Sequence, residues 1–211
     1  MKTLKLQNIS IIDQHGDADL LTFVNAHDLA LQHLKDCLQR EVIVSPKPFS
    51  WFEVLCKAIK FPARRYHFWW RIANYLYKTG GHKVKKYAIR INRNLRNKYG
   101  LDIKLGADIG EGFKISHFVG IVIADCAVIG TNFHITQNVT IGVKETDRPS
   151  KIVIGNDVTI GPNSCIIGND IVIGDNVTIG AMSFINENIP SDSVVYTPRL
   201  ASIVKMKHPV C

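Results

Sequence analysis

His117 is the side chain best suited to chemistry by its type and its place. Aliphatic residues recur every six positions in the second half of the chain, but the stretch 115–122 is two residues longer than its neighbours and contains this histidine. The backbone is expected to leave its regular path there and to present the imidazole outward. Because a neutral imidazole titrates near neutral pH, it can take the proton of an attacking hydroxyl as a general base. The alternative is a corner histidine that hydrogen-bonds to the backbone.

Arg148 and His134 are further candidates, for substrate binding. Arg148 lies in the segment 143–151, which interrupts the repeat between Ile141 and Ile154 and is expected to form a loop beside the site. A guanidinium can bind a carboxylate through paired hydrogen bonds, whereas the alternative is a solvated loop arginine. His134 is predicted to point outward one coil further on, either to contact an acceptor or as an ordinary surface histidine.

The six-residue period itself predicts the architecture. It fits neither the 3.6-residue period of a helix nor the alternation of an isolated strand. It fits a three-sided coil with one inward aliphatic residue per side and Gly or Asn at the corners, stacked on further coils of the same kind. The aliphatic positions are Ile103, Ile109, Ile115, Ile123, Ile129, Ile135, Ile141, Ile154, Ile160, Ile166, Ile173, Ile179 and Ile185.

These segments resemble the left-handed β-helix of the hexapeptide-repeat acyltransferases, and most closely the serine acetyltransferase branch. The matching text is IGEGFKISHFVGIVIADCAVIGTNFHITQNVTIG, followed by DRPSKIVIGNDVTIGPNSCIIGNDIVIGDNVTIGAMSFI. The longer coil with its histidine is shared at the same place. The text is also similar to relatives that acetylate sugars in bacterial polysaccharide clusters. The resemblance covers about half the chain. The expected fold class is α+β, an N-terminal helical part followed by a left-handed parallel β-helix of hexapeptide repeats.

The resemblance implies that His117 is the general base, and it also exposes two departures. The family has Asp directly before this histidine, where the chain has Ser116. The family loop reads Asp-Arg-His-Pro, and here Asp147 and Arg148 are kept as substrate-binding candidates while Pro149 replaces the histidine. Because that loop touches the amino acid in the serine enzymes, these departures argue against serine as the acceptor.

The resemblance further implies that acetyl-CoA is the acyl donor, held in a groove between neighbouring β-helices of a homotrimer, and that no metal is needed. Gln137 matches a family position near the active site. Pro162 stands where the family has Ala and removes one backbone N–H donor. The positions carried over for acetyl-CoA are Gly142, Val143, Gly161, Pro162 and Ala181, with Lys205 as a candidate for the phosphates.

The first half of the chain is expected to be helical. Capping and breaking residues predict helices from Asn25 to Arg40, over 50–61, over 62–78 and over 82–99, while the stretch LKLQNISIID is a candidate strand. The expected division is a basic, mainly helical part (1–100), a β-helix acetyltransferase domain (101–190) and a C-terminal tail (191–211).

The two halves differ in charge. Residues 1–100 hold 18 Lys and Arg against 7 Asp and Glu, whereas residues 101–211 hold 8 against 11. The cations between residues 78 and 98, with Trp69 and Trp70 upstream, permit three interpretations: a solvated helix face, a helix on an anionic membrane surface, or a surface that attracts a polyanionic acceptor. Nucleic acid is not expected, because no base-reading motif accompanies the charge.

We therefore expect an acetyl-CoA-dependent O-acetyltransferase whose acceptor is a sugar hydroxyl on a capsular polysaccharide or its precursor, with direct transfer. The alternatives are a divergent serine O-acetyltransferase and a non-catalytic β-helix that binds a glycan or a partner enzyme. The five scattered cysteines match no metal or disulfide spacing, and no apolar run is long enough to span a membrane. A cytoplasmic protein is expected, with peripheral contact at the inner membrane face or with capsule assembly as a further expectation.

Overall fold

The first part of the chain is an assembly of helices. The computed structural model describes residues 16–145 and 147–198, with side chains from residue 26 onward. The helical elements are α1 (Gly16–Leu38), the short π-helical turn η1 (Gln39–Ile43), α2 (Trp51–Lys60), α3 (Pro62–Thr79) and α4 (His82–Tyr99). The last three were expected at these positions. The predicted start of the first helix at Asn25 is wrong, because α1 begins at Gly16 and runs through Asn25. An asparagine inside a helix costs less than about 1 kcal/mol relative to alanine, so it does not stop the helix. The candidate strand LKLQNISIID lies outside the described residues.

The second part is the left-handed parallel β-helix that the repeat predicts. Its strands are β1 (Asp102–Ile103), β2 (Asp108–Ile109), β3 (Lys114–Ile115), β4 (Val122–Ile123), β5 (Ala127–Ile129), β6 (His134–Ile135), β7 (Thr140–Gly142), β8 (Ile152–Ile154), β9 (Thr159–Ile160), β10 (Cys165–Ile167), β11 (Val172–Ile173), β12 (Thr178–Ile179), β13 (Phe184–Ile185) and β14 (Val194–Val195). They form three parallel sheets, the faces of a triangular prism. Face A is β1-β4-β7-β10-β13, face B is β2-β5-β8-β11, and face C is β3-β6-β9-β12-β14.

The register of these sheets stacks isoleucine on isoleucine along the prism. Ile115 pairs with Ile135 and Ile135 with Ile160 on face C, and the side chains at these three positions are buried. Asn and Asp adopt left-handed backbone conformations at the corners, as at Asn138 (φ 56°) and Asn163 (φ 58°), which these residues tolerate better than most. The inward aliphatic column and the turn-forming corners together explain the six-residue period.

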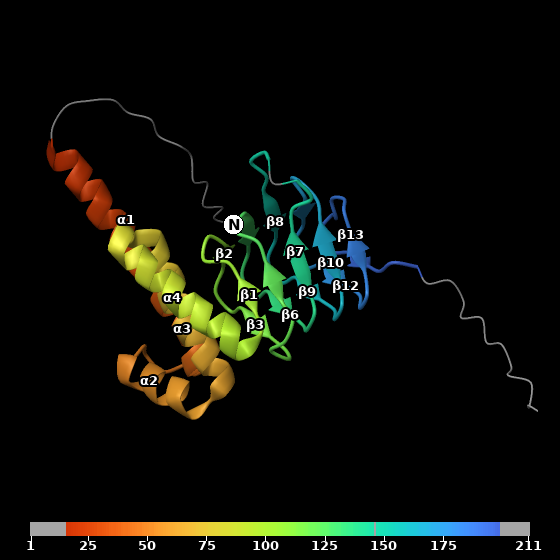
Figure 1. Ribbon diagram of the computed structural model, residues 1–211. Coiled ribbons are helices and arrows are strands. Elements are labelled where there is room, and N and C mark those ends of the chain that lie inside the picture. The colour runs from red at the N-terminus through yellow and green to blue at the C-terminus, as the bar shows by residue number, and fades with distance from the viewer. Residues whose placement is uncertain (1–15, 146, 199–211) are drawn as a thin grey trace, which may run out of the picture.

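The helices close the N-terminal end of the prism (Figure 1). Along the strands, backbone N–H groups of one coil donate to carbonyls of the next coil, as Lys104 donates to Ile123. The strand carbonyls of the first coil therefore receive nothing from a preceding coil. Helices α3 and α4 supply the missing donors, because buried polar groups need partners. The bonds are Trp70 Nε1 to Ile103 O (3.3 Å), Asn92 Nδ2 to Ile103 O (3.0 Å), Asn74 Nδ2 to Leu105 O (2.8 Å) and Ala107 O (3.0 Å), and Arg71 Nη1 to Ile109 O (2.6 Å).

A buried ion pair anchors this junction. The Arg71 guanidinium donates to both carboxylate oxygens of Glu41, at 2.9 and 2.6 Å, and Glu41 also accepts the Phe113 N–H at 3.0 Å. Burial alone would raise the pKa of Glu41, but the Arg71 charge, with His67 Nδ1 3.5 Å from Glu41 Oε2, lowers it to about 2. The carboxylate is therefore ionised at neutral pH, and both charges are neutralised where the helices meet the coils.

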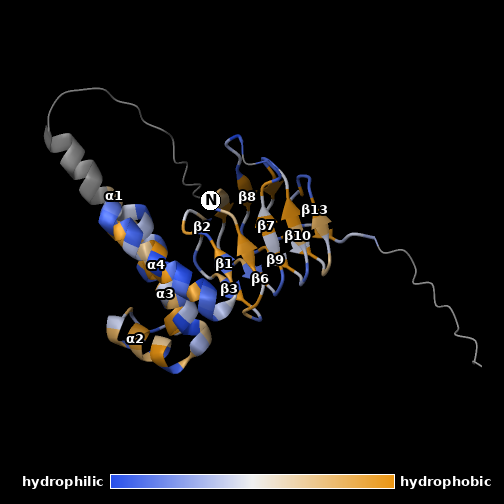
Figure 2. Cartoon of the chain, viewed as in Figure 1, coloured by the Kyte–Doolittle hydropathy of each residue, from blue (hydrophilic) through white to orange (hydrophobic). Residues whose placement is uncertain are grey.

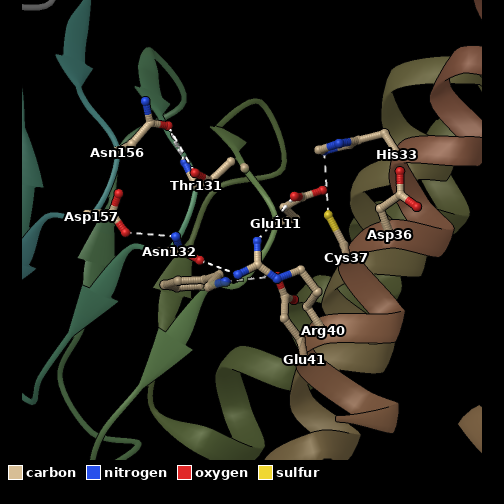
Figure 3. A network of polar contacts seen from close by, with 12 residues as sticks. His33, Asp36, Cys37, Arg40, Glu41, Glu111, Thr131, Asn132, Asn156 and Asp157 are labelled. Atoms are coloured by element: carbon tan, nitrogen blue, oxygen red, sulfur yellow. Dashed lines mark hydrogen bonds and ion pairs between the residues drawn. The ribbon is translucent and has the colours of Figure 1, made fainter. Parts of the chain in front are cut away.

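A second, exposed link joins the helices to the corner between faces B and C (Figure 3). Arg40 donates to Glu111 at 3.1 Å and to the Asn132 side chain, which in turn donates to Asp157 at 2.7 Å on the next coil. The link ties η1, directly after α1, to three successive coils.

Hydropathy differs between the helical part and the β-helix (Figure 2). The strands alternate outward polar and inward apolar residues, whereas the helices carry most of the positive charge. Trp70 is wholly buried against the first coil and Trp69 is 41% exposed, so only Trp69 contributes to the surface. In the described part of the chain, no helix has the length and apolar character to cross a membrane.

Candidate active site

His117 lies on the edge where face C turns into face A, between β3 and β4. The residue is exposed and has a left-handed backbone (φ 62°), and its carbonyl accepts the Val119 N–H at 2.9 Å. The two additional residues of this coil make the corner bulge outward. The structure therefore presents the imidazole to solvent, as its place in the longer coil predicts.

The bulging corner is held from both sides. Phe118 packs edge-on against Tyr66, with ring centroids 5.5 Å apart, and lies 6.2 Å from the Tyr99 ring. On the other side, the Gly120 N–H donates to Gly100 O at 3.0 Å, and Gly120 itself has φ +67°. A side chain at Gly120 would collide with the side chain of Asn138 on the next coil. The backbone beside the imidazole is thus fixed by aromatic packing and by a close contact between coils.

Ser116 stands where the related family has a carboxylate before the histidine, but its hydroxyl is directed to another histidine, His134. Its hydroxyl lies 2.8 Å from Nε2 of His134, the residue that pairs with Lys114 on face C. Burial and the nearby Lys114 charge lower the pKa of His134 below its ordinary value. The imidazole of His134 is therefore neutral at neutral pH and can accept the Ser116 O–H. Sequence reasoning treated these two residues separately, and the structure joins them in one pair next to His117.

Some of the candidate donor-binding positions, together with the substrate-binding candidate Gln137, form a column on the same edge. Gln137, Pro162 and Ala181 occupy the same corner position on successive coils as His117 does on the longer one. Asn163 N donates to Gln137 O at 3.1 Å and Met182 N to Pro162 O at 2.8 Å, so the column is continuous. A side chain at Gly161 would meet the backbone of Ala181 at 2.6 Å, so glycine is required there for the coils to approach.

Arg148 lies on a different edge, where face A turns into face B. Its guanidinium bonds Asp170 Oδ2 at 3.1 Å and lies 3.5 Å from Glu145 Oε2, and its side chain is about half exposed (52%). The backbone N–H groups of Lys144 and Glu145 donate to Asn169 Oδ1. The loop is therefore tethered to the next coil by exposed polar contacts.

The candidates thus divide between two edges of face A. Asp147 is exposed on the Arg148 loop, and Gly142 and Val143 lie where that loop begins. Crossing face A from Gln137 to Val143 takes six residues, up to roughly 20 Å at the rise of a strand. Within one chain the structure does not bring Arg148 to His117.

Some residues that shape this site gave no signal in the sequence. Phe118 was read only as part of the repeat text, although an aromatic side chain beside a corner histidine is a cue for anchoring. Asn169 and Asp170 likewise stand only within the repeat text, although their side chains hold the Arg148 loop. Lys205 lies outside the described residues. Among residues 16–145 and 147–198, no three His, Cys, Asp or Glu side chains gather closely enough to hold a metal ion.

Comparison with known proteins identifies relatives over most of the chain. Residues 151–187 match the family model described as bacterial transferase hexapeptide (six repeats). A serine acetyltransferase of Staphylococcus aureus is 33% identical over 169 residues, which cover 79% of this chain and 75% of that protein. Serine acetyltransferase 2 of Arabidopsis thaliana is 37% identical over 129 residues, but the match covers only 38% of its length and 60% of this chain.

Solved structures give a concordant result. Serine acetyltransferase isoform 3 of Entamoeba histolytica, solved in complex with cysteine, superposes with a TM-score of 0.66 at 28% identity, over 88% of this chain and 64% of that one. Native serine acetyltransferase 1 of the same organism gives 0.62 at 28% identity, over 83% and 69%.

These matches correct the expected acceptor. The prediction of a sugar hydroxyl on a capsular polysaccharide is wrong, since the matched relatives are serine acetyltransferases. The positive charge of the first half was a poor guide to the acceptor because part of it is neutralised by ion pairs within the protein, one buried and one partly exposed. Arg71 is paired with buried Glu41, and Lys78 pairs with Asp108 at 2.8 Å.

Proposed function

Because the chain belongs to the serine acetyltransferase family of hexapeptide-repeat proteins, we propose that it transfers the acetyl group of acetyl-CoA to the hydroxyl of L-serine. The observation that carries this proposal is the 33% identity to the Staphylococcus aureus serine acetyltransferase over three quarters of that protein. The exposed imidazole on the bulging corner supplies a group that can perform the chemistry.

In the proposed reaction His117 is the general base. Its neutral imidazole takes the proton from the serine hydroxyl as the hydroxyl oxygen attacks the thioester carbonyl. The carbon–sulfur bond then breaks, and the CoA thiolate receives that proton, so the products are O-acetylserine and CoA. The left-handed corner and the Phe118 packing support this role, because a base must be held in place to act efficiently.

We assign the serine carboxylate to Arg148 of a second subunit. A guanidinium binds a carboxylate through paired hydrogen bonds, and face A separates Arg148 from His117 within one chain. A homotrimer in which the His117 edge of one β-helix faces the Arg148 edge of the next brings them together. Serine would then compete with Asp170 and Glu145 for the guanidinium.

The pantetheine arm of acetyl-CoA is assigned to the column of Gln137, Pro162 and Ala181, which begins next to His117. Pro162 and Ala181 are small and leave room along this edge, and backbone groups are the available partners. Pro162 has no N–H to donate, so one hydrogen bond fewer is expected from that coil. The β-helix (101–190) is proposed as the acetyltransferase domain and the helical part (1–100) as its cap.

Ser116 and Pro149 remain as departures within this function. Where the family has a carboxylate, this site has the neutral Ser116–His134 pair. We propose that His134, with Ser116, contacts the bound serine in place of the missing groups.

The test is product formation by the purified full-length protein. Acetyl-CoA and L-serine are incubated with the enzyme, and O-acetylserine and free CoA thiol are measured together, with D-serine, L-threonine and L-homoserine as comparison acceptors. Stoichiometric O-acetylserine and CoA, with L-serine preferred, is the expected result. Thioester turnover with another acceptor but not with L-serine would overturn the proposal.

A further inference from the structure

Helix α2 exposes an unusual number of large apolar side chains. Phe52 is 77% exposed, Ile59 72%, Leu55 48% and Trp51 42%. At 100° per residue these four positions fall within an arc of about 100° on one side of the helix. Val54 and Ala58, on another side, are buried against η1 and α3. The outer face of α2, defined as Trp51, Phe52, Leu55 and Ile59, is therefore available to a partner.

Cations gather at the C-terminal end of α2 and on the side opposite this face, and acids are scarce. Residues 54–101 contain thirteen Lys and Arg and no Asp or Glu. At the end of α2, three cations surround the partly exposed ring of Phe61: Lys57 at 6.0 Å, Lys60 at 5.5 Å and Arg64 at 4.5 Å from its centroid. Glu53 is the single acid of α2. A partner of this surface needs both apolar groups and negative charge.

A second copy of the chain does not fit these requirements. Four partly exposed side chains offer a few hundred Å², whereas a stable protein interface buries about 800 Å² on each partner. A soluble polyanion would satisfy the charge but leave Phe52 and Ile59 in water.

We propose that the outer face of α2 docks on an anionic lipid bilayer. The four apolar side chains enter the boundary between headgroups and acyl chains, and Lys57, Lys60 and Arg64 remain at the level of the anionic headgroups. An amphipathic helix with an apolar face and basic flanks binds membrane interfaces in this way, and long basic side chains can reach back to the headgroups. The sequence pointed to the cations of residues 78–98 for such contact, whereas the structure points to α2.

Vesicle binding of the full-length protein tests the proposal. The protein is sedimented with vesicles of phosphatidylcholine alone and of phosphatidylcholine with phosphatidylglycerol, at low and high salt. Three double variants are compared. Phe52→Ser with Ile59→Ser removes the apolar contact, and Lys57→Gln with Lys60→Gln removes charge. The matched control is Phe184→Ser with Val194→Ser, which removes two apolar side chains that are 55% and 73% exposed on the β-helix.

The unchanged protein is expected to bind phosphatidylglycerol vesicles, and this binding should fall at least tenfold in the Phe52/Ile59 variant. Binding should fall less in the Lys57/Lys60 variant and at high salt, and it should stay unchanged in the control. Unchanged thermal unfolding of each variant shows that the fold is intact. Equal binding to both vesicle types, or equal loss in the control, would overturn the proposal. So would a change in sedimenting mass without vesicles in the Phe52/Ile59 variant, because that result identifies a protein partner. Binding to heparin but not to vesicles would assign the surface to a soluble polyanion instead.

Discussion

The two edges that border face A are built differently. The His117 edge is held by the packing of Phe118 on helices α3 and α4 and by the close contact of Gly120 with Asn138. The Arg148 edge carries a loop whose tethers, Asp170 and Glu145, are exposed carboxylates. One edge is fixed by packing and the other by polar contacts that water or a ligand can replace.

This difference fits two separate functions, proton transfer at the His117 edge and carboxylate binding at the Arg148 edge. A general base requires accurate placement, and a misplacement of about 1 Å can cost about 100-fold in rate. A group that recognises a carboxylate must exchange one anionic partner for another. Exposed ion pairs are weak enough for such exchange. Changes on the His117 edge are therefore expected to lower kcat, and changes on the Arg148 edge to raise KM.

Replacement of His117 should have the largest effect. His117→Ala removes the base and is expected to lower kcat by roughly 10²–10⁴-fold. Affinity for acetyl-CoA should barely change, because the Gln137–Pro162–Ala181 column is intact. Steady-state kinetics and equilibrium binding of acetyl-CoA measure the two effects. Near wild-type turnover would instead assign the base to His134.

Replacement of Arg148 should act on serine binding. Arg148→Ala removes a charge-assisted contact and is expected to raise KM for L-serine about 10- to 100-fold, with kcat nearly unchanged. Arg148→Lys keeps the charge but not the paired geometry and should fall between. If Asp170→Asn gives the same increase as Arg148→Ala, Arg148 serves only as a loop tether and the assignment to serine is wrong.

Loss of the Phe118 anchor should loosen the His117 edge. Phe118→Ala is expected to lower the free energy of unfolding by about 1–3 kcal/mol, because the ring is partly buried and contacts several aromatic rings. It should also lower kcat without raising KM for serine. Phe184→Ala, on the exposed side of β13, is the matched control and should leave both quantities nearly unchanged. A rise in KM alone in Phe118→Ala would contradict the division between the edges.

The smallest expected effect is the pH dependence contributed by His134. Its pKa is lowered in the folded protein, so the unfolded chain binds protons more readily near this pKa and stability falls as the pH drops below the ordinary value of 6.5. His134→Gln should therefore reduce the loss of melting temperature between pH 7.5 and pH 5.5. An unchanged loss in the variant would show that His134 titrates alike in both states.

The sequence allowed the fold to be predicted because the isoleucine period reflects a physical repeat, one inward side chain on each side of a coil. The exposed place of His117 could be predicted from the two extra residues of its coil. The Ser116–His134 contact could not, since it depends on the register between strands β3 and β6. The acceptor was predicted wrongly because Ser116, Pro149 and the positive charge of the first half were taken as evidence against serine. Charge counted along the chain does not reveal that Arg71 is buried against Glu41, and two substituted positions do not outweigh identity over three quarters of a relative. The roles of the site residues stay predictions.

Subunit mixing tests most directly whether the two edges form one site between chains. His117→Ala and Arg148→Ala proteins are unfolded together in equal amounts, refolded, and assayed at L-serine well below the wild-type KM, where each variant alone is nearly inactive. In a randomly assembled trimer with sites between neighbours, about one quarter of the sites combine an intact His117 with an intact Arg148 of the next subunit. The account predicts recovery of about a quarter of wild-type activity. A mixture no more active than the average of its two components would contradict it.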